Sequence, residues 1–160
     1  MVSSITLKNL IIGYRSKHQL RAIASPVHAS LQAGELTCLI GANGVGKSTL
    51  LRTLAGFQPA LDGEILIQAK SLSDFSAQEL AREISIVLTT KTDHAQLSAE
   101  EIVGIGRSPY TGFWGTLSAA DKQIVAAALQ EAGIQHLAQR NISELSDGER
   151  QKVMIAKALA

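Results

Sequence analysis

The stretch GANGVGKST, residues 41–49, decides the fold that we predict for this chain. It follows a nearly continuous apolar run at 35–40, which is typical of a strand covered on both faces of a parallel sheet. It precedes a segment at 47–55 whose leucines share one helical face and which Gly56 ends. A glycine-rich loop between a strand and a helix is the context in which such a loop binds phosphate. The sequence therefore predicts an α/β fold with a phosphate-binding loop.

The residue types in this loop suit a nucleoside triphosphate and Mg²⁺. Glycines let the backbone turn so that successive amides point inward at phosphate oxygens, and the following helix adds its positive end. We expect Lys47 to contact the β- and γ-phosphates, Ser48 to bind Mg²⁺ and Thr49 to donate to the α-phosphate. The alternative is a glycine-rich turn without a ligand. The predicted nucleotide-binding residues of the loop are Gly41, Ala42, Asn43, Gly44, Val45, Gly46, Lys47, Ser48 and Thr49.

Further strands and helices extend the α/β pattern. Strands are predicted at 5–12, 64–67 and 84–88. Helix starts are predicted where a serine and a carboxylate stand three residues apart, because the two side chains then satisfy free amides of the first turn. After residue 98 we expect a mostly helical lobe, with an amphipathic face at 124–129 that ends near Gly133. The serine–carboxylate pairs are Ser76 with Glu79, Ser98 with Glu101, and Ser118 with Asp121.

The composition favours one globular domain built of sublobes. The 160 residues are 46% hydrophobic and include 15 basic and 14 acidic side chains, for a net charge of +1. These charges form no basic stripe, so we expect no nucleic-acid partner. No apolar window approaches the ~20 residues of a membrane span, so we expect a cytoplasmic chain without direct lipid insertion. Cys38, in the apolar run, is expected to be a small buried hydrophobic residue.

A second motif, LSDGERQ at 145–151, follows the loop by about a hundred residues. Together with LIGANGVGKSTLLRTLAG and GERQKVMIAKALA, it resembles the ATP-binding-cassette (ABC) ATPases, whose signature is usually LSGGQ. Here Asp stands for the first glycine and Glu for the glutamine. The resemblance implies a head-to-tail dimer in which the signature of one copy closes over the ATP of the other. The alternative is a purely local helix cap. The signature residues are Leu145, Ser146, Asp147, Gly148 and Glu149.

The resemblance assigns roles to two more residues. Tyr14 matches an aromatic residue that stacks on adenine, with a strand-end core contact as the alternative. Thr89 matches a glutamine that touches Mg²⁺ and the attacking water, so we expect it to act through a metal-bound water. The segment IGRSPYTGFWGTLSAADKQIVAAAL, 105–129, resembles the helical lobe of importers of iron-siderophore, haem and cobalamin complexes. Its aromatic loop, Pro109, Tyr110, Phe113 and Trp114, is interpreted as a packing plug or a permease contact.

The resemblance also identifies elements that these residues lack. The family's Mg²⁺-binding Asp, its catalytic Glu and a later His would follow Ala160, so we expect a carboxy-terminally truncated cassette without its general base. The largely apolar last helix and an open sheet edge then predict aggregation. The histidines are expected to be solvated or loop residues. They are His18, His28, His94 and His136.

The predicted layout has three parts of one partial nucleotide-binding domain. An antiparallel β lobe with the phosphate-loop core spans about 1–75, a core strand and the glutamine-loop equivalent about 76–90, and the helical lobe with the signature about 91–160. We expect a homodimer on two permease subunits at the inner face of the cell membrane, powering import with ATP and Mg²⁺. The alternatives are a soluble ABC protein without a transport role and a non-hydrolytic nucleotide-binding module.

Overall fold

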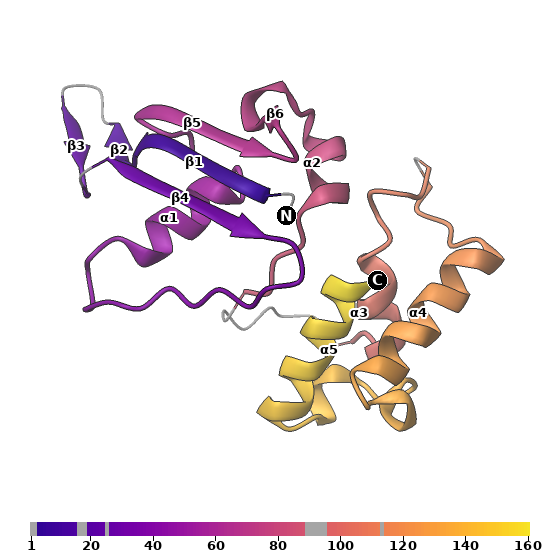
Figure 1. Cartoon of the computed structure of the whole chain (residues 1–160). Coiled ribbons are helices and arrows are strands. Elements are labelled where there is room, and N and C mark those ends of the chain that lie inside the picture. The colour runs from indigo at the N-terminus through magenta and orange to yellow at the C-terminus, as the bar shows by residue number, and fades with distance from the viewer. Residues whose placement is uncertain (1–2, 16–18, 25, 89–95, 113) are drawn as a thin grey trace. The chain divides into compact units, whose positions relative to one another are not determined.

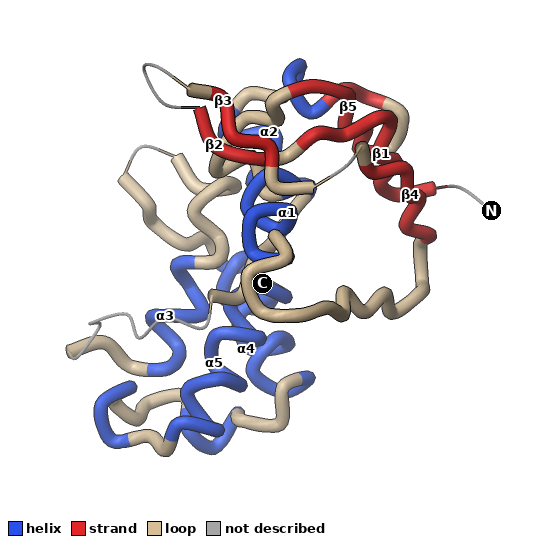
Figure 2. Tube along the Cα trace, turned by 90° about the vertical axis from the view of Figure 1, so that its left-hand side faces the viewer, coloured by secondary structure: helices blue, strands red, loops and turns tan. Residues whose placement is uncertain are grey.

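The computed structural model describes residues 3–15, 19–24, 26–88, 96–112 and 114–160 (Figure 1). The chain divides into two compact units, Met1–Leu80 and Ala81–Ala160. Strands and the loop with its helix form the first unit, and the second is helical (Figure 2). The three-part layout predicted from the sequence remains a prediction.

The first unit is an antiparallel sheet with a separate two-stranded ribbon. The sheet has the order β4-β1-β5-β6, and the ribbon pairs β2 with β3. On β1, Thr6 pairs with Ser30 of β4 on one side and with Leu66 of β5 on the other. The predicted antiparallel lobe is therefore confirmed. The strands are β1 (Ser3–Ile11), β2 (Gly13–Arg15), β3 (Leu20–Ala22), β4 (Val27–Gln32), β5 (Asp62–Ile67) and β6 (Lys70–Ser71).

The predicted helix after the loop is α1 (Lys47–Leu54), and Gly56 follows it with a φ of 72°. Its predicted leucine face is partly wrong, because Leu51 is 56% exposed while the buried side chains of the helix are Thr49 and Thr53. The unit continues through η1 (Leu72–Asp74) into α2 (Ala77–Glu83). The core of the first unit consists of buried Leu7, Leu10, Ile12 and Ile65, packed against the half-buried Leu50 and Leu54 of α1.

Two predicted strands are wrong. Residues 35–40 and 84–88 have no regular secondary structure. Leu36 and Ile40 are 94% and 89% exposed, and Cys38, predicted to be buried, is also exposed. An apolar sequence favours burial, but a strand of a parallel sheet exists only through the hydrogen bonds of its neighbours. Within the described ranges every strand pair is antiparallel and neither segment has a partner strand, so the expected parallel core sheet is not formed there.

Three helices pack together in the second unit, α3 (Ala99–Ile105), α4 (Ala119–Glu131) and α5 (Asp147–Leu159), with the short turns η2 (Gln135–Leu137) and η3 (Ile142–Glu144). Capping boxes open α3 at Ser98 and α4 at Ser118, as predicted. The predicted cap of α2 is also present, since the amide of Glu79 donates to the Ser76 hydroxyl over 3.2 Å. The core of this unit includes Ile102, Val103, Val125, Leu129, Ile134, Leu145 and Val153.

Arg107 and Gly106 join the three helices where α3 ends. Arg107 Nε donates to Asp121 Oδ1 over 2.9 Å, and its Nη1 donates to the carbonyl of Ala160 over 2.6 Å. The Tyr110 ring lies 3.9 Å from the Arg107 guanidinium, which fits the packing role of the aromatic loop, whereas Trp114 is 88% exposed. Gly106 lies so close to α5 that a Cβ there would be 2.2 Å from the carbonyl oxygen of Lys157. A glycine is therefore required at this crossing.

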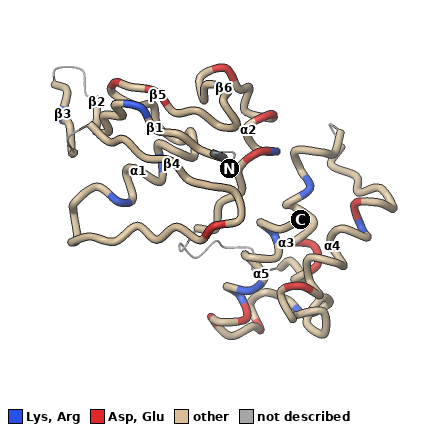
Figure 3. The backbone as a smooth tube through the Cα atoms, in the orientation of Figure 1, with Lys and Arg blue, Asp and Glu red and all other residues tan. Residues whose placement is uncertain are grey.

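The charged residues are dispersed through both units. Figure 3 shows basic and acidic positions interspersed along the tube, with no long run of one sign. No helix in the described part of the chain is long and apolar enough to span a bilayer. His28 and His136 are exposed, as expected, while His18 and His94 lie outside the described residues.

Candidate functional site

The loop at 41–46 leads into the amino end of α1 through two residues with positive φ. Gly44 has a φ of 82° and Gly46, the N-cap residue of α1, has a φ of 105°. A Cβ on Gly46 would be 2.7 Å from Ile23 Cγ2, so both conformation and space require glycine there. No side chain caps α1. The positive end of the helix therefore faces the loop without a side-chain cap from its N-cap residue.

The Lys47 side chain folds back over the loop. Its Nζ donates to the carbonyl oxygens of Gly41 over 2.7 Å and of Ala42 over 2.8 Å. These bonds hold the ammonium beside the backbone that precedes the helix, and they leave its charge without a carboxylate partner in the described structure. An ammonium held in this way is available to a polyanion that enters the loop.

Tyr14 and Thr49 are joined by a hydrogen bond between the ribbon and the helix. The Tyr14 hydroxyl lies 3.2 Å from Thr49 Oγ1, and Thr49 is 5% exposed while Tyr14 is 50% exposed. With Tyr14 as the donor, Thr49 keeps its own proton for another acceptor. The bond fixes the edge of the tyrosine ring and leaves much of the ring uncovered, which is the form that a stacking platform needs.

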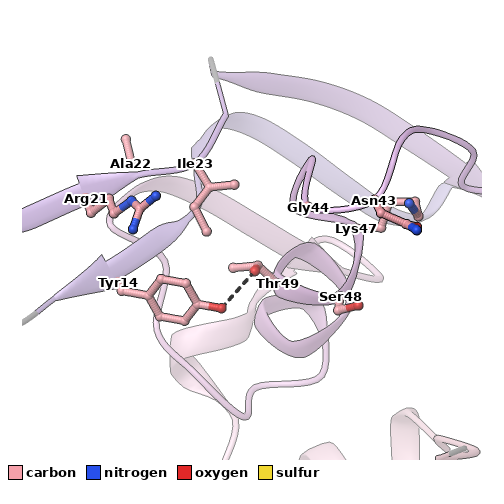
Figure 4. Close-up of a pocket in the computed structure, with 10 residues that line it drawn as sticks. Tyr14, Arg21, Ala22, Ile23, Asn43, Gly44, Lys47, Ser48 and Thr49 are labelled. Atoms are coloured by element: carbon pink, nitrogen blue, oxygen red, sulfur yellow. Dashed lines mark hydrogen bonds between the residues drawn. The ribbon is translucent and has the colours of Figure 1, made fainter.

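Tyr14, Lys47 and Thr49 line one open cavity of about 510 Å³ (Figure 4). Of the ten predicted nucleotide-binding residues, seven line it, while Gly41, Ala42 and Val45 do not. Among the described residues, the lining contains two cationic side chains and no carboxylate, so the cavity suits an anion. Its lining residues are Tyr14, Arg21, Ala22, Ile23, Asn43, Gly44, Gly46, Lys47, Ser48 and Thr49.

Sequence reasoning missed the contribution of the second ribbon strand, β3. Arg21, Ala22 and Ile23 line the same cavity, although no motif marks them. Antiparallel pairing of the two short strands β2 and β3 brings Arg21 opposite Tyr14 in the ribbon. The residue that lies opposite Tyr14 depends on the register of β2 against β3, and that register was not predicted from the sequence.

The residues of the second motif open α5 in the second unit. Ser146 is the N-cap residue, and its Oγ accepts from the Glu149 amide over 3.3 Å and donates to Glu149 Oε2 over 2.7 Å. Leu145 is 2% exposed and anchors the turn in the core. Asp147 and Gly148 are exposed. The Ser146–Glu149 pair therefore forms the local helix cap that was predicted from the sequence as the alternative to a signature motif. The backbone of Gly148 is still accessible to solvent.

Hydrogen bonds fix the charge of Glu149. Those from the Ser146 hydroxyl and amide lower the pKa of Glu149 below its ordinary value of 4.5, and the nearby positive charge of Arg140 contributes in the same direction. Glu149 is therefore a carboxylate at neutral pH. The helix start carries this negative charge where the usual signature has a neutral glutamine.

Metal-binding candidates are few. In the described ranges no group of three or more His, Cys, Asp or Glu side chains is arranged to hold an ion. Ser48 lines the cavity, and its metal role remains a prediction. Thr89, the other predicted contact, lies outside the described residues, as does Phe113 of the aromatic loop.

Comparison with known proteins agrees with this arrangement. The family model described as ABC transporter matches residues 24–160. An uncharacterised ABC transporter ATP-binding protein of Haemophilus influenzae is 42% identical over 153 residues, covering 96% of this chain and 57% of the relative. The iron(3+)-hydroxamate import ATP-binding protein of Bacillus subtilis is 35% identical over 159 residues, covering 99% and 58%.

A solved structure titled an inward-facing conformation of a putative metal-chelate type ABC transporter superposes with a TM-score of 0.79 at 27% identity, covering 99% of this chain and 56% of that one. The chain spans 51 to 58% of the length of the first three curated relatives. The match over most of its residues shows that this chain belongs to the ABC transporter family.

Proposed function

We propose that this chain is the nucleotide-binding part of an ABC importer ATPase and that it binds ATP in the cavity beside α1. One observation carries the proposal: an uncapped helix start, the Lys47 ammonium and the half-exposed Tyr14 ring converge on a single cavity without a carboxylate. A triphosphate supplies the negative charge that these groups lack, and a purine base supplies a flat face for Tyr14.

The same cavity fits Mg²⁺ as the companion of the nucleotide. Mg²⁺ in such sites takes one or two protein oxygens and completes its coordination with substrate phosphates and water, so the Ser48 hydroxyl is a sufficient starting ligand. When bound, the ion would neutralise charge on the phosphates. The role of Thr89 in contacting a metal-bound water remains a prediction.

Binding and hydrolysis have different requirements in this proposal. No Asp or Glu is among the described residues that line the cavity, so these residues offer groups that bind phosphate and none that would deprotonate water. We therefore assign nucleotide binding to these 160 residues, and we assign ATP hydrolysis to the complete transporter. A preparation of this chain alone is expected to bind ATP and to show little turnover.

The proposed assembly is a head-to-tail dimer in which Ser146 and Gly148 of one copy approach the ATP of the other. The exposed Gly148 and the amino end of α5 would supply backbone amides to that phosphate, in a first turn that also carries the carboxylates of Asp147 and Glu149. Permease subunits would hold this dimer at the inner face of the cell membrane, and the aromatic loop with exposed Trp114 is a candidate permease contact. The relative named for iron(3+)-hydroxamate import supports an iron complex as the cargo, with haem and cobalamin as the other candidates.

The binding step is tested with a fluorescent ATP analogue and two lysine variants. Lys47→Ala is expected to weaken binding by at least tenfold, since a charge-assisted hydrogen bond to phosphate contributes about 1.5–3 kcal/mol. Lys8→Ala is the control, because Lys8 is exposed and pairs with Glu64 on the sheet, away from the cavity lining. Equal affinities of the two variants would contradict the proposed site.

The transport step is tested in cells. Deleting the gene is expected to abolish uptake of one class of radiolabelled complex among iron-siderophore, haem and cobalamin, and restoring the complete gene should recover it. Normal uptake of all three in the deletion strain would favour the soluble ABC protein over the importer.

A further inference from the structure

The β2–β3 ribbon presents Arg21 to the cavity next to Tyr14. The two residues are direct partners in the antiparallel ribbon, so their side chains project from the same face of it. Both line the cavity together with the loop and the start of α1 (Figure 4). The ribbon is tightly closed here, since a Cβ on Gly13 would be 2.1 Å from the carbonyl oxygen of Arg21. The position of Arg21 is thus fixed by backbone pairing.

The charge of Arg21 is uncompensated in the described structure. The side chain is exposed, and its guanidinium has neither a hydrogen bond nor an ion pair with any residue that the structure describes. Lys47, the other cation of the cavity, at least donates to two loop carbonyls. Since none of the described residues that line the cavity is a carboxylate, the guanidinium can donate to an anion that enters.

We propose that Arg21 is a second phosphate-binding cation of this site, acting from the ribbon while Lys47 acts from the loop. A guanidinium presents paired N–H donors that match two phosphate oxygens, whereas an ammonium acts as a point charge. Two cations of these kinds on opposite sides of one cavity would hold a phosphate chain between them. The inference rests on the proposed function, because it names a further contact for the same nucleotide.

The test compares Arg21→Ala and Arg21→Lys with the matched control Arg15→Ala. Arg15 is exposed on the same ribbon, one residue from Tyr14 and therefore on the opposite face, and it is not among the lining residues. The ligands are the Mg²⁺ complexes of ATP and of inorganic tripolyphosphate, titrated by calorimetry. Arg21→Ala is expected to reduce the affinity for both ligands about tenfold. A hydrogen bond to a charged group is strong, but solvent partly screens the one that Arg21 would make. Arg21→Lys should recover part of that loss, and Arg15→Ala should bind like the unmodified chain.

Three outcomes would overturn the proposal. Unchanged binding of both ligands by Arg21→Ala removes Arg21 from the site, and if Lys47→Ala still loses binding, the proposed function stands without it. A loss for ATP with none for tripolyphosphate would assign Arg21 to the base or sugar and contradict the phosphate contact. Equal losses in the Arg21→Ala and Arg15→Ala variants would show a general charge effect. Circular dichroism of each variant confirms that the ribbon change has not unfolded the chain.

Discussion

Replacing Gly106 with alanine is expected to destabilise the helical unit by about 2 kcal/mol. The new Cβ would be 2.2 Å from the carbonyl oxygen of Lys157 on α5, where a carbon and a carbonyl oxygen ordinarily come no closer than about 3.3 Å. The helices must therefore separate by roughly 1 Å, and overpacking of this kind costs about 1–3 kcal/mol. The φ of Gly106, the C-cap residue of α3, is −57°, so the change adds no left-handed strain and its cost comes from the close contact.

Gly104→Ala is the matched control, two residues earlier on α3. The nearest atom to its new Cβ is the tip of the Leu117 side chain at 3.1 Å, which can shift, so the variant is expected to be near neutral. Urea denaturation followed by far-ultraviolet circular dichroism measures both variants. Gly106→Ala should lower the midpoint by about 1 M, from a slope of roughly 1–3 kcal/mol per molar urea. Equal stabilities of the two variants would refute the close packing of α3 on α5.

Three further predictions concern the loop, the signature helix and the core. Gly46→Ala should reduce affinity for the ATP analogue more than Gly44→Ala, because both positions need positive φ but only Gly46 is also blocked, by a neighbouring side chain 2.7 Å away. Ser146→Ala should cost about 0.5–2 kcal/mol in urea denaturation at pH 7 through loss of the α5 cap. Because the pKa of Glu149 is lowered in the folded chain, its stabilising contribution is present above its ordinary value of 4.5 and disappears as the pH falls through the folded value. The difference in unfolding free energy between the unmodified chain and Ser146→Ala should therefore become smaller as Glu149 is protonated in acid. A difference that does not change with pH would contradict the coupling of stability to the protonation of Glu149. Leu129→Ala should cost about 2–5 kcal/mol at a site that is 2% exposed, with a loss under 1 kcal/mol speaking against its place in the core.

Local signals in the sequence were reliable wherever neighbouring residues decide the structure. The serine–carboxylate spacing predicted the helix starts at Ser98, Ser118 and Ser146, because a capping box closes within four residues. The loop and the helix after it were predicted for the same reason, since glycines with positive φ and a helix start are local features. The strands predicted at 5–12 and 64–67 correspond to β1 and β5, because alternation and turn signals are also local.

The predictions that failed depended on distant partners. The apolar run at 35–40 has the composition of a buried strand, yet Leu36 is 94% exposed and Cys38 is uncovered, because no strand among the described residues supplies the hydrogen bonds and the cover. The leucine face of α1 failed similarly, since tertiary packing covers Thr49 and Thr53 in place of Leu51. A side chain is buried only when another part of the chain packs against it. Sequence periodicity identifies the apolar face of one element and does not identify the element that covers it.

By itself, the sequence determined the chemistry of the loop: a lysine, hydroxyls and glycines in an order that suits phosphate, and a capped helix far along the chain. Only the tertiary structure decided that Tyr14 reaches Thr49 across 35 positions and that Arg21 lies beside it in the same cavity. The physical reason is that a motif determines the backbone conformation of its own residues. The register of two paired strands, in contrast, determines which residues from distant parts of the chain lie next to that motif.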